Sequence, residues 1–218
     1  MEIKWFGQSC FQITVKDAVL VFDPYSEEIG LKLPSLKADI VLVSHQHRDH
    51  NNTAAVSGTV SGRPKVFSEP GEYETAGVYI EGVASFHDAA QGQERGANTI
   101  FVADCDGVRV CHLGDLGHEL SSEQLEAIGE ADLLMIPVGG IYTIDAQKAI
   151  AVINQIEPKI IIPMHYKIPG LNIDLADLTE FVQQADISDI EEKDSLNVTK
   201  ADLPKEEREF VILKPQNK

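Results

Sequence analysis

The chain has few cysteines, no long apolar run and no segment typical of export. Its three cysteines, Cys10, Cys105 and Cys111, are odd in number and widely spaced, which is typical of reduced thiols and not of a disulfide framework. No apolar run approaches the roughly 20 residues of a membrane-spanning helix, and Met1–Phe6 lacks the basic and apolar regions of a signal peptide. We therefore expect a cytoplasmic protein with no membrane partner.

Cationic residues are also scarce. The 218 residues include 18 Lys and Arg against 35 Asp and Glu, which gives a net charge of −17. Nucleic-acid binding depends largely on Lys and Arg at phosphates, so we expect no nucleic-acid partner. A hydrophobic content of 43% is sufficient for a buried core, and a chain of this length buries about 70% of its unfolded surface. No stretch has the composition of a linker, so residues 1–218 are expected to form a single domain.

One short segment, Ser44–His50, concentrates residue types that bind metals. Within six positions it places three histidines and one aspartate: His45, His47, Asp49 and His50. The segment directly follows the apolar run Asp39–Val43, which predicts a buried strand. Imidazole and carboxylate groups together suit zinc and other divalent first-row metals. An exposed polar loop is the alternative, but such loops seldom collect three histidines in so short a stretch.

The spacing within this segment favours two adjacent ions. His45 and His47 are two residues apart, so they lie on the same side of an extended chain. Asp49 and His50 are adjacent and point in different directions where a turn or helix begins. One pair could therefore bind one ion, and the second pair a neighbouring ion.

This segment resembles the His-x-His-x-Asp-His motif of the metallo-β-lactamase superfamily. The resemblance implies an α/β fold, a four-layer αββα sandwich of two mixed β-sheets flanked by helices, with the metal site at one edge. It also implies three later metal ligands, in the order His, Asp, His. The candidates each follow a short apolar segment, at or near the end of an expected strand: His87, Asp115 and His165.

Within the superfamily, the chain most resembles the small stand-alone metal-dependent hydrolases that include the ascorbate-6-phosphate lactonase-like group. The ligand pattern extends from Asp23 to His165, which is most of the chain. Four short segments carry the closer resemblance: Trp5–Cys10 (WFGQSC), Phe86–Asp88 (FHD), His112–His118 (HLGDLGH) and Pro163–Tyr166 (PMHY).

The family arrangement, transferred to these positions, implies two divalent metal ions. Zinc is favoured, with manganese or iron as alternatives, because the ligand chemistry alone does not choose among them. The resemblance assigns one ion to His45, His47 and His87, the other to Asp49, His50 and His165, and gives Asp115 the role of bridging both.

Three further roles follow from the resemblance and from strand geometry. Asp49 is the expected catalytic residue, because a free carboxylate oxygen can orient the attacking water or carry its proton. Asp23, just before Pro24, is expected to accept a hydrogen bond from a ligand histidine and fix its tautomer; a turn residue is the alternative. His112 lies three positions before Asp115 and so on the opposite face of the strand, which indicates a structural role.

The implied activity is metal-assisted hydrolysis at an electrophilic carbonyl or phosphorus. The chain has no room for the added domains of thioester-hydrolysing or RNA-processing relatives, so we expect a small-molecule substrate such as an ester, a lactone or a phosphodiester. Loop residues near the predicted ligands are candidates for binding it, with an ordinary loop role as the alternative for each: Arg95, Asn98, His118, Tyr142 and Lys167. Family members commonly self-associate, which leaves a homo-oligomer open.

Two other functions compete with hydrolysis. The superfamily supports di-iron redox chemistry, but those relatives usually carry Glu where His47 stands and add a flavin domain, and neither feature is present. A non-catalytic metal-binding module is the other alternative. Relatives that have lost activity usually lose ligands, whereas all seven positions are filled here.

The remaining pattern predicts strands first and helices later. Strands are expected at Trp5–Val15, Ala18–Phe22, Arg63–Phe67, Val78–Val83, Thr99–Val102, Val108–Leu113 and Phe210–Leu213. Helices are expected from Ser121 to Gly129, from Asp145 to Ile156 and from Asp174 to Gln184, with Ile187–Lys205 as an irregular acidic surface segment. A faint repeat, in which a strand that ends in Asp is followed later by an Ala-Asp-led strand, occurs in both halves and fits a two-half sandwich.

Overall fold

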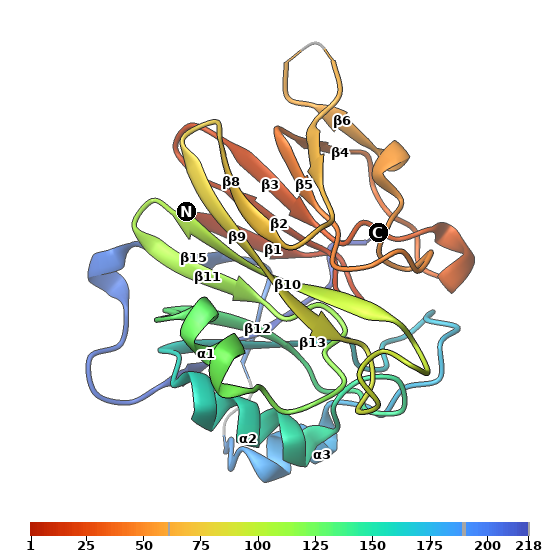
Figure 1. The fold of residues 1–218 in the computed structure, drawn as a ribbon, viewed down its shortest axis with the longest axis vertical. Coiled ribbons are helices and arrows are strands. Elements are labelled where there is room, and N and C mark those ends of the chain that lie inside the picture. The colour runs from red at the N-terminus through yellow and green to blue at the C-terminus, as the bar shows by residue number, and fades with distance from the viewer. Residues whose placement is uncertain (61, 189–190, 218) are drawn as a thin grey trace.

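A computed structural model describes residues 1–60, 62–188 and 191–217, and Figure 1 shows its two β-sheets. The first sheet has six strands and is built mostly from the N-terminal third of the chain. Its strands run in the order β15 (Leu196–Asn197), β1 (Glu2–Trp5), β2 (Phe11–Thr14), β3 (Val19–Phe22), β5 (Ile40–Leu42) and β7 (Lys65–Phe67). β1 to β3 are antiparallel to one another, whereas β5 and β7 continue the sheet in parallel.

The second sheet has seven strands. Their order is β16 (Glu209–Phe210), β13 (Ile160–Met164), β12 (Leu133–Pro137), β11 (Val108–His112), β10 (Ala97–Cys105), β9 (Val78–Phe86) and β8 (Gly71–Thr75). β8 to β11 form an antiparallel meander, and β11, β12, β13 and β16 are parallel. Both sheets are therefore mixed, as the sequence predicted. Two small two-stranded sheets join β4 (Leu36–Ala38) to β6 (Val56–Gly58), and β14 (Glu192–Lys193) to β17 (Ile212–Leu213).

The described α-helices all lie on the outer face of the second sheet (Figure 1). They are α1 (Ser122–Ile128), α2 (Ala146–Ile156) and α3 (Thr179–Gln184). Ser121 and Gln124 form the expected capping box of α1, and the Asp145 side chain caps α2. The loops of the first sheet contain the short 3-10 helices η1 (Glu27–Ile29) and η2 (Thr53–Ala55), and η3 (Lys200–Asp202) follows late in the sequence. None of the described helices is long and apolar enough to pass through a bilayer.

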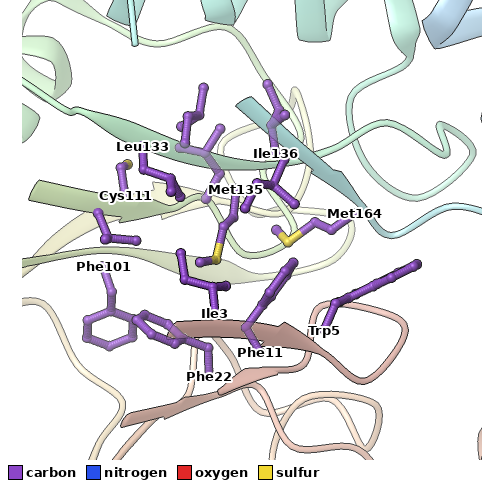
Figure 2. Close-up of a cluster of buried hydrophobic side chains, with 14 of the residues drawn as sticks. Ile3, Trp5, Phe11, Phe22, Phe101, Cys111, Leu133, Met135, Ile136 and Met164 are labelled. Carbon is purple, nitrogen blue, oxygen red and sulfur yellow. The ribbon is translucent and has the colours of Figure 1, made fainter. Parts of the chain in front are cut away.

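The main core lies between the two sheets. Along β1, Ile3 and Trp5 are buried while Glu2 and Lys4 are partly exposed, which is the alternation expected of a strand with one covered face. Figure 2 shows aromatic side chains of the first sheet pointing toward the sulfur and aliphatic side chains of β12 and β13. β12 and β13 are buried along their whole length because α2 covers the other face of the sheet.

The internal repeat is present in the fold. β3 and β5 are parallel neighbours in the first sheet, and β11 and β12 are parallel neighbours in the second. Asp23 follows β3 directly, and Asp115 lies three residues after β11. The two halves of the sandwich therefore place an aspartate at matching strand ends.

Some predicted elements have different boundaries. The expected strand Trp5–Val15 is two strands, because Gly7 and Gln8 adopt left-handed φ angles of 97° and 52° and reverse the chain. The helix expected from Asp174 begins only at Thr179. Its first turn does not form because the backbone of Ala176 is bonded to Gly139 and Lys167 instead.

The C-terminal predictions also need correction. Phe210–Leu213 is not one strand but two short ones, β16 and β17, which pair in different sheets. The segment Ile187–Lys205 is not wholly irregular, since it contains β14, β15 and η3; residues 189 and 190 lie outside the described part of the chain. β15 adds a strand to the open edge beside β1 and so anchors this acidic segment to the sandwich.

Candidate metal centre

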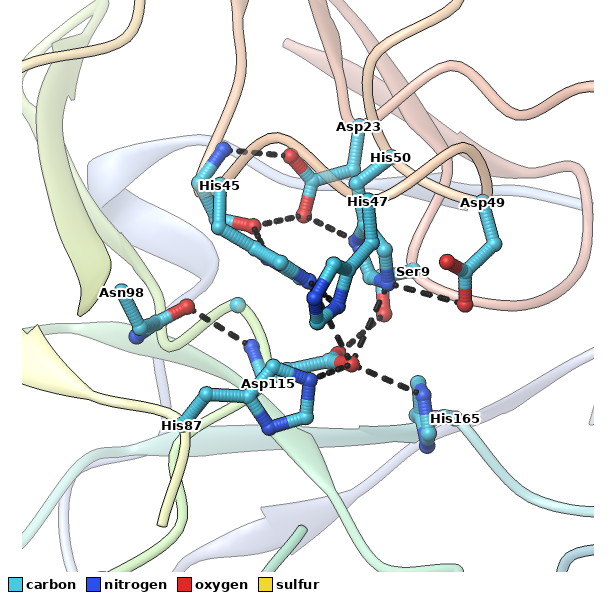
Figure 3. A network of polar contacts seen from close by, with 12 residues as sticks. Ser9, Asp23, His45, His47, Asp49, His50, His87, Asn98, Asp115 and His165 are labelled. Atoms are coloured by element: carbon cyan, nitrogen blue, oxygen red, sulfur yellow. Dashed lines mark hydrogen bonds and ion pairs between the residues drawn. The ribbon is translucent and has the colours of Figure 1, made fainter. Parts of the chain in front are cut away.

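Four strand ends meet at one edge of the sandwich and bring the predicted metal ligands together. The loop after β5 carries residues 45–50, and the ends of β9, β11 and β13 carry His87, Asp115 and His165. Figure 3 shows the imidazoles from both sheets turned toward the Asp115 carboxylate. The structure thus gathers all seven residues from distant parts of the sequence.

Asp115 is the centre of this cluster. Its Oδ2 atom lies 3.2 Å from Nε2 of His50, 3.1 Å from Nε2 of His87 and 3.1 Å from Nε2 of His165. Nε2 of His45 is 3.9 Å from the same oxygen. One carboxylate oxygen therefore faces four imidazoles, two from the first half of the sandwich and two from the second.

The seven side chains form two neighbouring groups. Within each group, the potential ligand atoms all lie within 4.8 Å of one another. The first group is His45, His47 and His87, and the second is Asp49, His50, Asp115 and His165. The family arrangement implies the same sets for two adjacent ions, except that it gives Asp115 to both, whereas Asp115 falls in the second group alone. All but His47 and Asp49 are buried.

Asp23 and Ser44 fix the orientation of two of the histidines. Asp23 Oδ2 accepts hydrogen bonds from Ser44 Oγ at 2.7 Å and from His50 Nδ1 at 2.9 Å. Ser44 Oγ in turn lies 2.9 Å from His45 Nδ1 and can accept a hydrogen bond from the Nδ1–H group. The network therefore assigns the Nδ1–H tautomer to neutral His45 and leaves Nε2 of both imidazoles toward the cluster.

A second set of contacts holds the Asp115 loop. The backbone N–H of Asp115 donates to Oδ1 of Asn98 at 3.0 Å. Gly114, with φ of 56°, has no space for a Cβ atom because Asn98 and Ser44 press against it. Only glycine fits this close approach, so the strand end and the ligand loop of the other sheet are packed directly together.

The buried carboxylates of the cluster stabilise positive charge placed between them. Burial raises the pKa of Asp115, but the neighbouring His165 and His50 lower it well below its ordinary value. Burial lowers the pKa of His50, but Asp115, Asp49 and Asp23 together raise it well above its usual range. For His45, burial and the nearby His50 lower the pKa to about 3. His45 is therefore neutral near pH 7, and His50 retains a proton between three carboxylates.

This environment fits a metal cation. His45 presents an unprotonated Nε2 atom to the cluster, since its Nδ1 proton is directed at Ser44. Nε2 of His50 is buried and has no hydrogen-bond partner among the described residues, although it faces the carboxylates of Asp115 and Asp49. A divalent cation would replace the proton of His50, because imidazoles must be unprotonated to bind metals. The donor set of five imidazoles and two carboxylates matches the preferences of zinc and its neighbours.

His112 lies behind this cluster. Its Nε2–H donates to the carbonyl of Ser9 at 2.9 Å, and its Nδ1 accepts the backbone N–H of Gly114 at 3.1 Å. The ring is fully buried and stacks on Phe22 with a centroid separation of 5.0 Å. Both nitrogens are therefore used within the protein, in agreement with the structural role expected from strand alternation.

A cavity of about 310 Å³ opens over the cluster. Two of the five candidate substrate-binding residues, Arg95 and Tyr142, line it together with the exposed faces of His47 and Asp49. The guanidinium carbon of Arg95 lies 5.7 Å from the ring centroid of Tyr142. Both side chains are therefore placed to contact a molecule bound at the cluster.

The other three candidates are directed elsewhere. The Asn98 amide is buried and bonded at both ends to Asp115, Ser85 and Leu113. His118 uses one ring nitrogen to accept from the N–H of Phe86 and the other to donate to the carbonyl of Glu119. The Lys167 ammonium donates to two carbonyls of its own loop, Leu171 and Ile173. None of the three lines the cavity over the cluster, so the structure gives them positioning and loop-closing roles instead.

Gln8 and Ser44 were not identified from the sequence as residues of the site. Each contacts a predicted ligand by a side-chain hydrogen bond, Gln8 to Asp49 at 3.0 Å and Ser44 to His45 at 2.9 Å. Ser44 directly precedes the histidine motif, which is a signal that could have been used. Gln8 is 41 residues from its partner, and no local pattern indicates that contact.

Asp88 was also missed as a functional residue. Its carboxylate is buried and closes the loop between β9 and β10. It accepts hydrogen bonds, between 2.7 and 3.0 Å long, from the backbone N–H groups of Ala90, Gly92, Glu94 and Arg95. Burial raises the pKa of Asp88, but these four donors lower it below its ordinary value. The loop that follows His87 is therefore shaped around one ionised carboxylate.

Two mixed sheets with a histidine and aspartate cluster at their common edge define a metallohydrolase fold of the β-lactamase type. The profile of the family described as the beta-lactamase superfamily domain matches residues 2–165. The chain belongs to this superfamily, and it is a metal-dependent hydrolase.

Individual relatives agree with this assignment. The chain is 30% identical to the UPF0173 metal-dependent hydrolase Ta0764 of Thermoplasma acidophilum, with 76% of this chain and 83% of that protein covered. A crystal structure of a Thermotoga maritima protein of the metallo-β-lactamase superfamily is 37% identical, with a TM-score of 0.79 and coverage of 97% and 98%. The metallo hydrolase Igni18 of Ignicoccus hospitalis is 21% identical, with a TM-score of 0.64 and coverage of 91% and 99%, and shows the same fold.

Proposed function

We propose that the protein hydrolyses a small ester, lactone or phosphodiester at a dinuclear metal centre. The observation that carries this proposal is the pair of neighbouring ligand groups: Asp115 belongs to the second group, and its Oδ2 atom also lies near Nε2 of His45 and His87 in the first. His45, His47 and His87 would hold one ion, Asp49, His50 and His165 the other, and Asp115 would contact both. When bound, two divalent ions would lower the pKa of water toward neutrality and polarise the electrophile.

The protein's own groups support this reaction in distinct ways. Asp49 lines the cavity, and its Oδ2 atom is held by Gln8 and by the nearby His50. Burial raises the pKa of Asp49, but the charge and the hydrogen bond of His50, together with the charge of His165, lower it well below its ordinary value, so the carboxylate is ionised at neutral pH. Among the described residues its Oδ1 atom has no such contact, and it can take the proton of an attacking water. We therefore assign Asp49 as the proton acceptor.

The cavity limits the size of the substrate. Its volume of about 310 Å³ is at the lower end for small-molecule sites. The walls include the side chains of Tyr142 and Ile173 together with the ligand imidazoles, which suits a small molecule that has apolar and polar parts. The similarity to metal-dependent hydrolases favours hydrolysis over di-iron redox chemistry.

Metal content and hydrolysis measured together test this proposal. The protein is stripped with a chelator, reloaded with zinc or manganese, and assayed with p-nitrophenyl acetate and bis(p-nitrophenyl) phosphate while bound metal is counted by mass spectrometry. We expect two ions per chain and activity that depends on them. Full activity in protein shown to be free of metal would refute the proposal.

Two histidine variants provide a matched comparison. His165→Ala removes a predicted ligand and should abolish activity and release one ion. His118→Ala removes an imidazole whose hydrogen bonds, in the described part of the chain, are to backbone groups, and it should keep both ions and activity. Asp115→Asn should weaken both ions together; loss of one ion alone would contradict the bridging role.

A further inference from the structure

Arg95 stands between two cavities. It lines the cavity of about 310 Å³ over the metal cluster, and it also lines an adjoining cavity of about 360 Å³. His47 is the other residue that both cavities share, while Glu69 and Pro70 lie in the second one only. A molecule that extends from the metal cluster into the second cavity would therefore lie beside Arg95 and His47.

The backbone of Arg95 is fixed by the Asp88 loop. Its N–H donates to Asp88 Oδ2 at 2.7 Å, which is among the shortest of the four bonds that close this loop. The guanidinium itself is held more loosely. Nη2 reaches the carbonyl of Ile141 at 3.4 Å, and Nη1 is 3.7 Å from the carboxylate of Glu94. These long contacts leave most of the five guanidinium donors free for another partner.

The segment opposite Arg95 has an unusual backbone. Ile141 adopts a φ of 58° and is 55% exposed, although a β-branched residue rarely occupies the left-handed region. This conformation directs the Ile141 carbonyl to Arg95 and places the Tyr142 ring beside the guanidinium. Strained backbone of this kind concentrates at ligand-binding sites.

The charge of Arg95 is exceptional in its surroundings. The protein has a net charge of −17, yet Arg95 is the one Arg or Lys among the described residues that line the cavity over the cluster. A guanidinium in a partly enclosed site attracts carboxylates and phosphates and can bind them through two parallel hydrogen bonds. The overall acidic surface would instead repel anions that have no such partner.

We propose that Arg95, held against Tyr142, binds an oxyanion of the substrate, either a carboxylate or a phosphate. The substrate is then an anionic molecule whose scissile group lies at the metal cluster and whose charged group lies between the two cavities. This assignment of the substrate class rests on the proposed hydrolase function. The binding site itself does not, because Arg95 would attract the same anions in the absence of any reaction.

Two esters of equal length test the effect on catalysis. p-Nitrophenyl valerate and mono-p-nitrophenyl glutarate share the leaving group and differ in a terminal carboxylate. Arg95→Met should lower kcat/KM for the glutarate ester by about tenfold or more, the loss expected for a charge-assisted hydrogen bond, and change the valerate ester by less than about threefold. An equal loss for both esters would assign Arg95 a structural role, and no loss for either would remove it from the site; both results overturn the proposal.

A binding measurement separates the two oxyanions and does not depend on turnover. Calorimetric titration of the metal-loaded protein with valerate, glutarate and 4-phosphonobutyrate measures the gain from the second charged group. Wild-type protein should bind one of the dianions at least tenfold more tightly than valerate, and Arg95→Met should lose that gain. The dianion with the larger gain identifies carboxylate or phosphate as the preferred group. Equal affinities for all three ligands in both proteins would overturn the proposal.

A surface arginine serves as the control in both experiments. Arg208 is exposed and donates to Asn154 at 2.9 Å, away from both cavities. Arg208→Met should leave the rates and affinities unchanged, and the melting temperature of each variant checks that it is folded. If the wild-type protein hydrolyses neither ester but still binds a dianion through Arg95, the proposed function fails for these substrates while the oxyanion site stands.

Discussion

The Gln8 side chain donates a hydrogen bond from Nε2 to Asp49 Oδ2 at 3.0 Å. Gln8 is fully buried, and its backbone carbonyl also accepts the N–H of His165 at 3.1 Å. One residue in the turn between β1 and β2 therefore contacts two ligands predicted for the same ion, one from each sheet. The left-handed φ of 52° at Gln8 makes both contacts possible at once.

Loss of this contact should weaken the metal centre. We expect Gln8→Leu to lower metal affinity or activity by about 10- to 100-fold, because groups that orient metal ligands typically contribute this much. Competition with a chelating dye measures the affinity. Gln12→Leu is the matched control, since Gln12 in the next strand donates to the Lys37 carbonyl at the surface. Equal affinities in Gln8→Leu and the wild-type protein would show that Asp49 needs no support.

Removal of the Ser44 hydroxyl should affect His45 without removing any ligand. Ser44→Ala breaks the connection from His45 Nδ1 through Ser44 Oγ to Asp23. We expect metal affinity to fall by about tenfold or more because the His45 tautomer is no longer fixed. Ser57→Ala is the control, since Ser57 donates to the Leu36 carbonyl in the small β4–β6 sheet. A variant that binds metal as tightly as Ser57→Ala would refute the role of Ser44.

Metal removal should lower stability as well as activity. The predicted ligands come from strand ends of both sheets, so the folded protein offers the assembled metal site and the unfolded chain has no comparable one. Free metal at 100 times its dissociation constant should stabilise the fold by about 2.7 kcal/mol. Urea unfolding with and without a chelator measures this difference. Asp115→Asn should show a smaller difference; an identical shift would contradict the central place of Asp115.

A buried carboxylate far from the cluster should control part of the acid sensitivity. Asp132 accepts hydrogen bonds from the backbone N–H of Arg109 and from the ammonium groups of Lys159 and Lys200. Burial raises its pKa, but these donors lower it below the ordinary value of 3.8. The charged form thus stabilises the native state above about pH 4, and this contribution is lost as the pH falls through the lowered pKa.

The variant Asp132→Asn tests that contribution. At pH 7 it should lower the free energy of unfolding by about 2 kcal/mol, because hydrogen bonds to a charged group are lost. The difference from the wild-type protein should shrink as the pH falls below about 4, because the unfolded wild-type chain takes up a proton there first and the native carboxylate follows at its lowered pKa. Urea denaturation at pH 7, 5 and 3 measures it, with the exposed turn residue changed in Asp17→Asn as control. A pH-independent difference would show that charge is not the cause.

The predictable part of the site follows from strand ends. Residues 45–50 place four candidate ligands in one local segment, and His87, Asp115 and His165 each follow an apolar run, so their convergence at one sheet edge was foreseeable. The two mixed sheets, the superfamily and the hydrolase class were predicted correctly. The roles of the individual ligands stay predictions, to be tested by the variants described above.

The supporting contacts could not be predicted because they depend on side-chain geometry across the fold. Lys167 and His118 lie close to predicted ligands in sequence. The Lys167 ammonium, however, donates to carbonyls of its own loop, and the His118 ring is bonded to the backbone of Glu119 and of Phe86 at the end of β9. Asn98 faces the interior, where the backbone of Asp115 needs an acceptor. Gln8 is distant in sequence and reaches Asp49 only through a left-handed turn. The hydrophobic periodicity of the sequence, from which strands and helices are predicted, does not indicate these side-chain contacts.

The boundaries that differed have a related cause. Residues 174–178 resemble a helix start, yet the backbone of Ala176 bonds to Gly139 and Lys167 near the cavity wall. Tertiary hydrogen bonds override the local preference there. The strand expected at Trp5–Val15 is interrupted by Gly7, whose left-handed φ of 97° begins the turn that delivers Gln8.

In the loop that closes around Asp88, the conformation of the backbone does not depend on the side chains that point outward. Four of its backbone N–H groups donate hydrogen bonds to the buried Asp88 carboxylate, while the side chains of Gln91, Gln93 and Glu94 are exposed to solvent. Random substitutions at Gln93 and Glu94, with Asp88 retained, should therefore leave the protein folded, whereas the left-handed φ of 58° at Gln91 restricts the residues accepted there. The outward face of this loop can therefore change in sequence while the bonds to Asp88 hold its backbone in place.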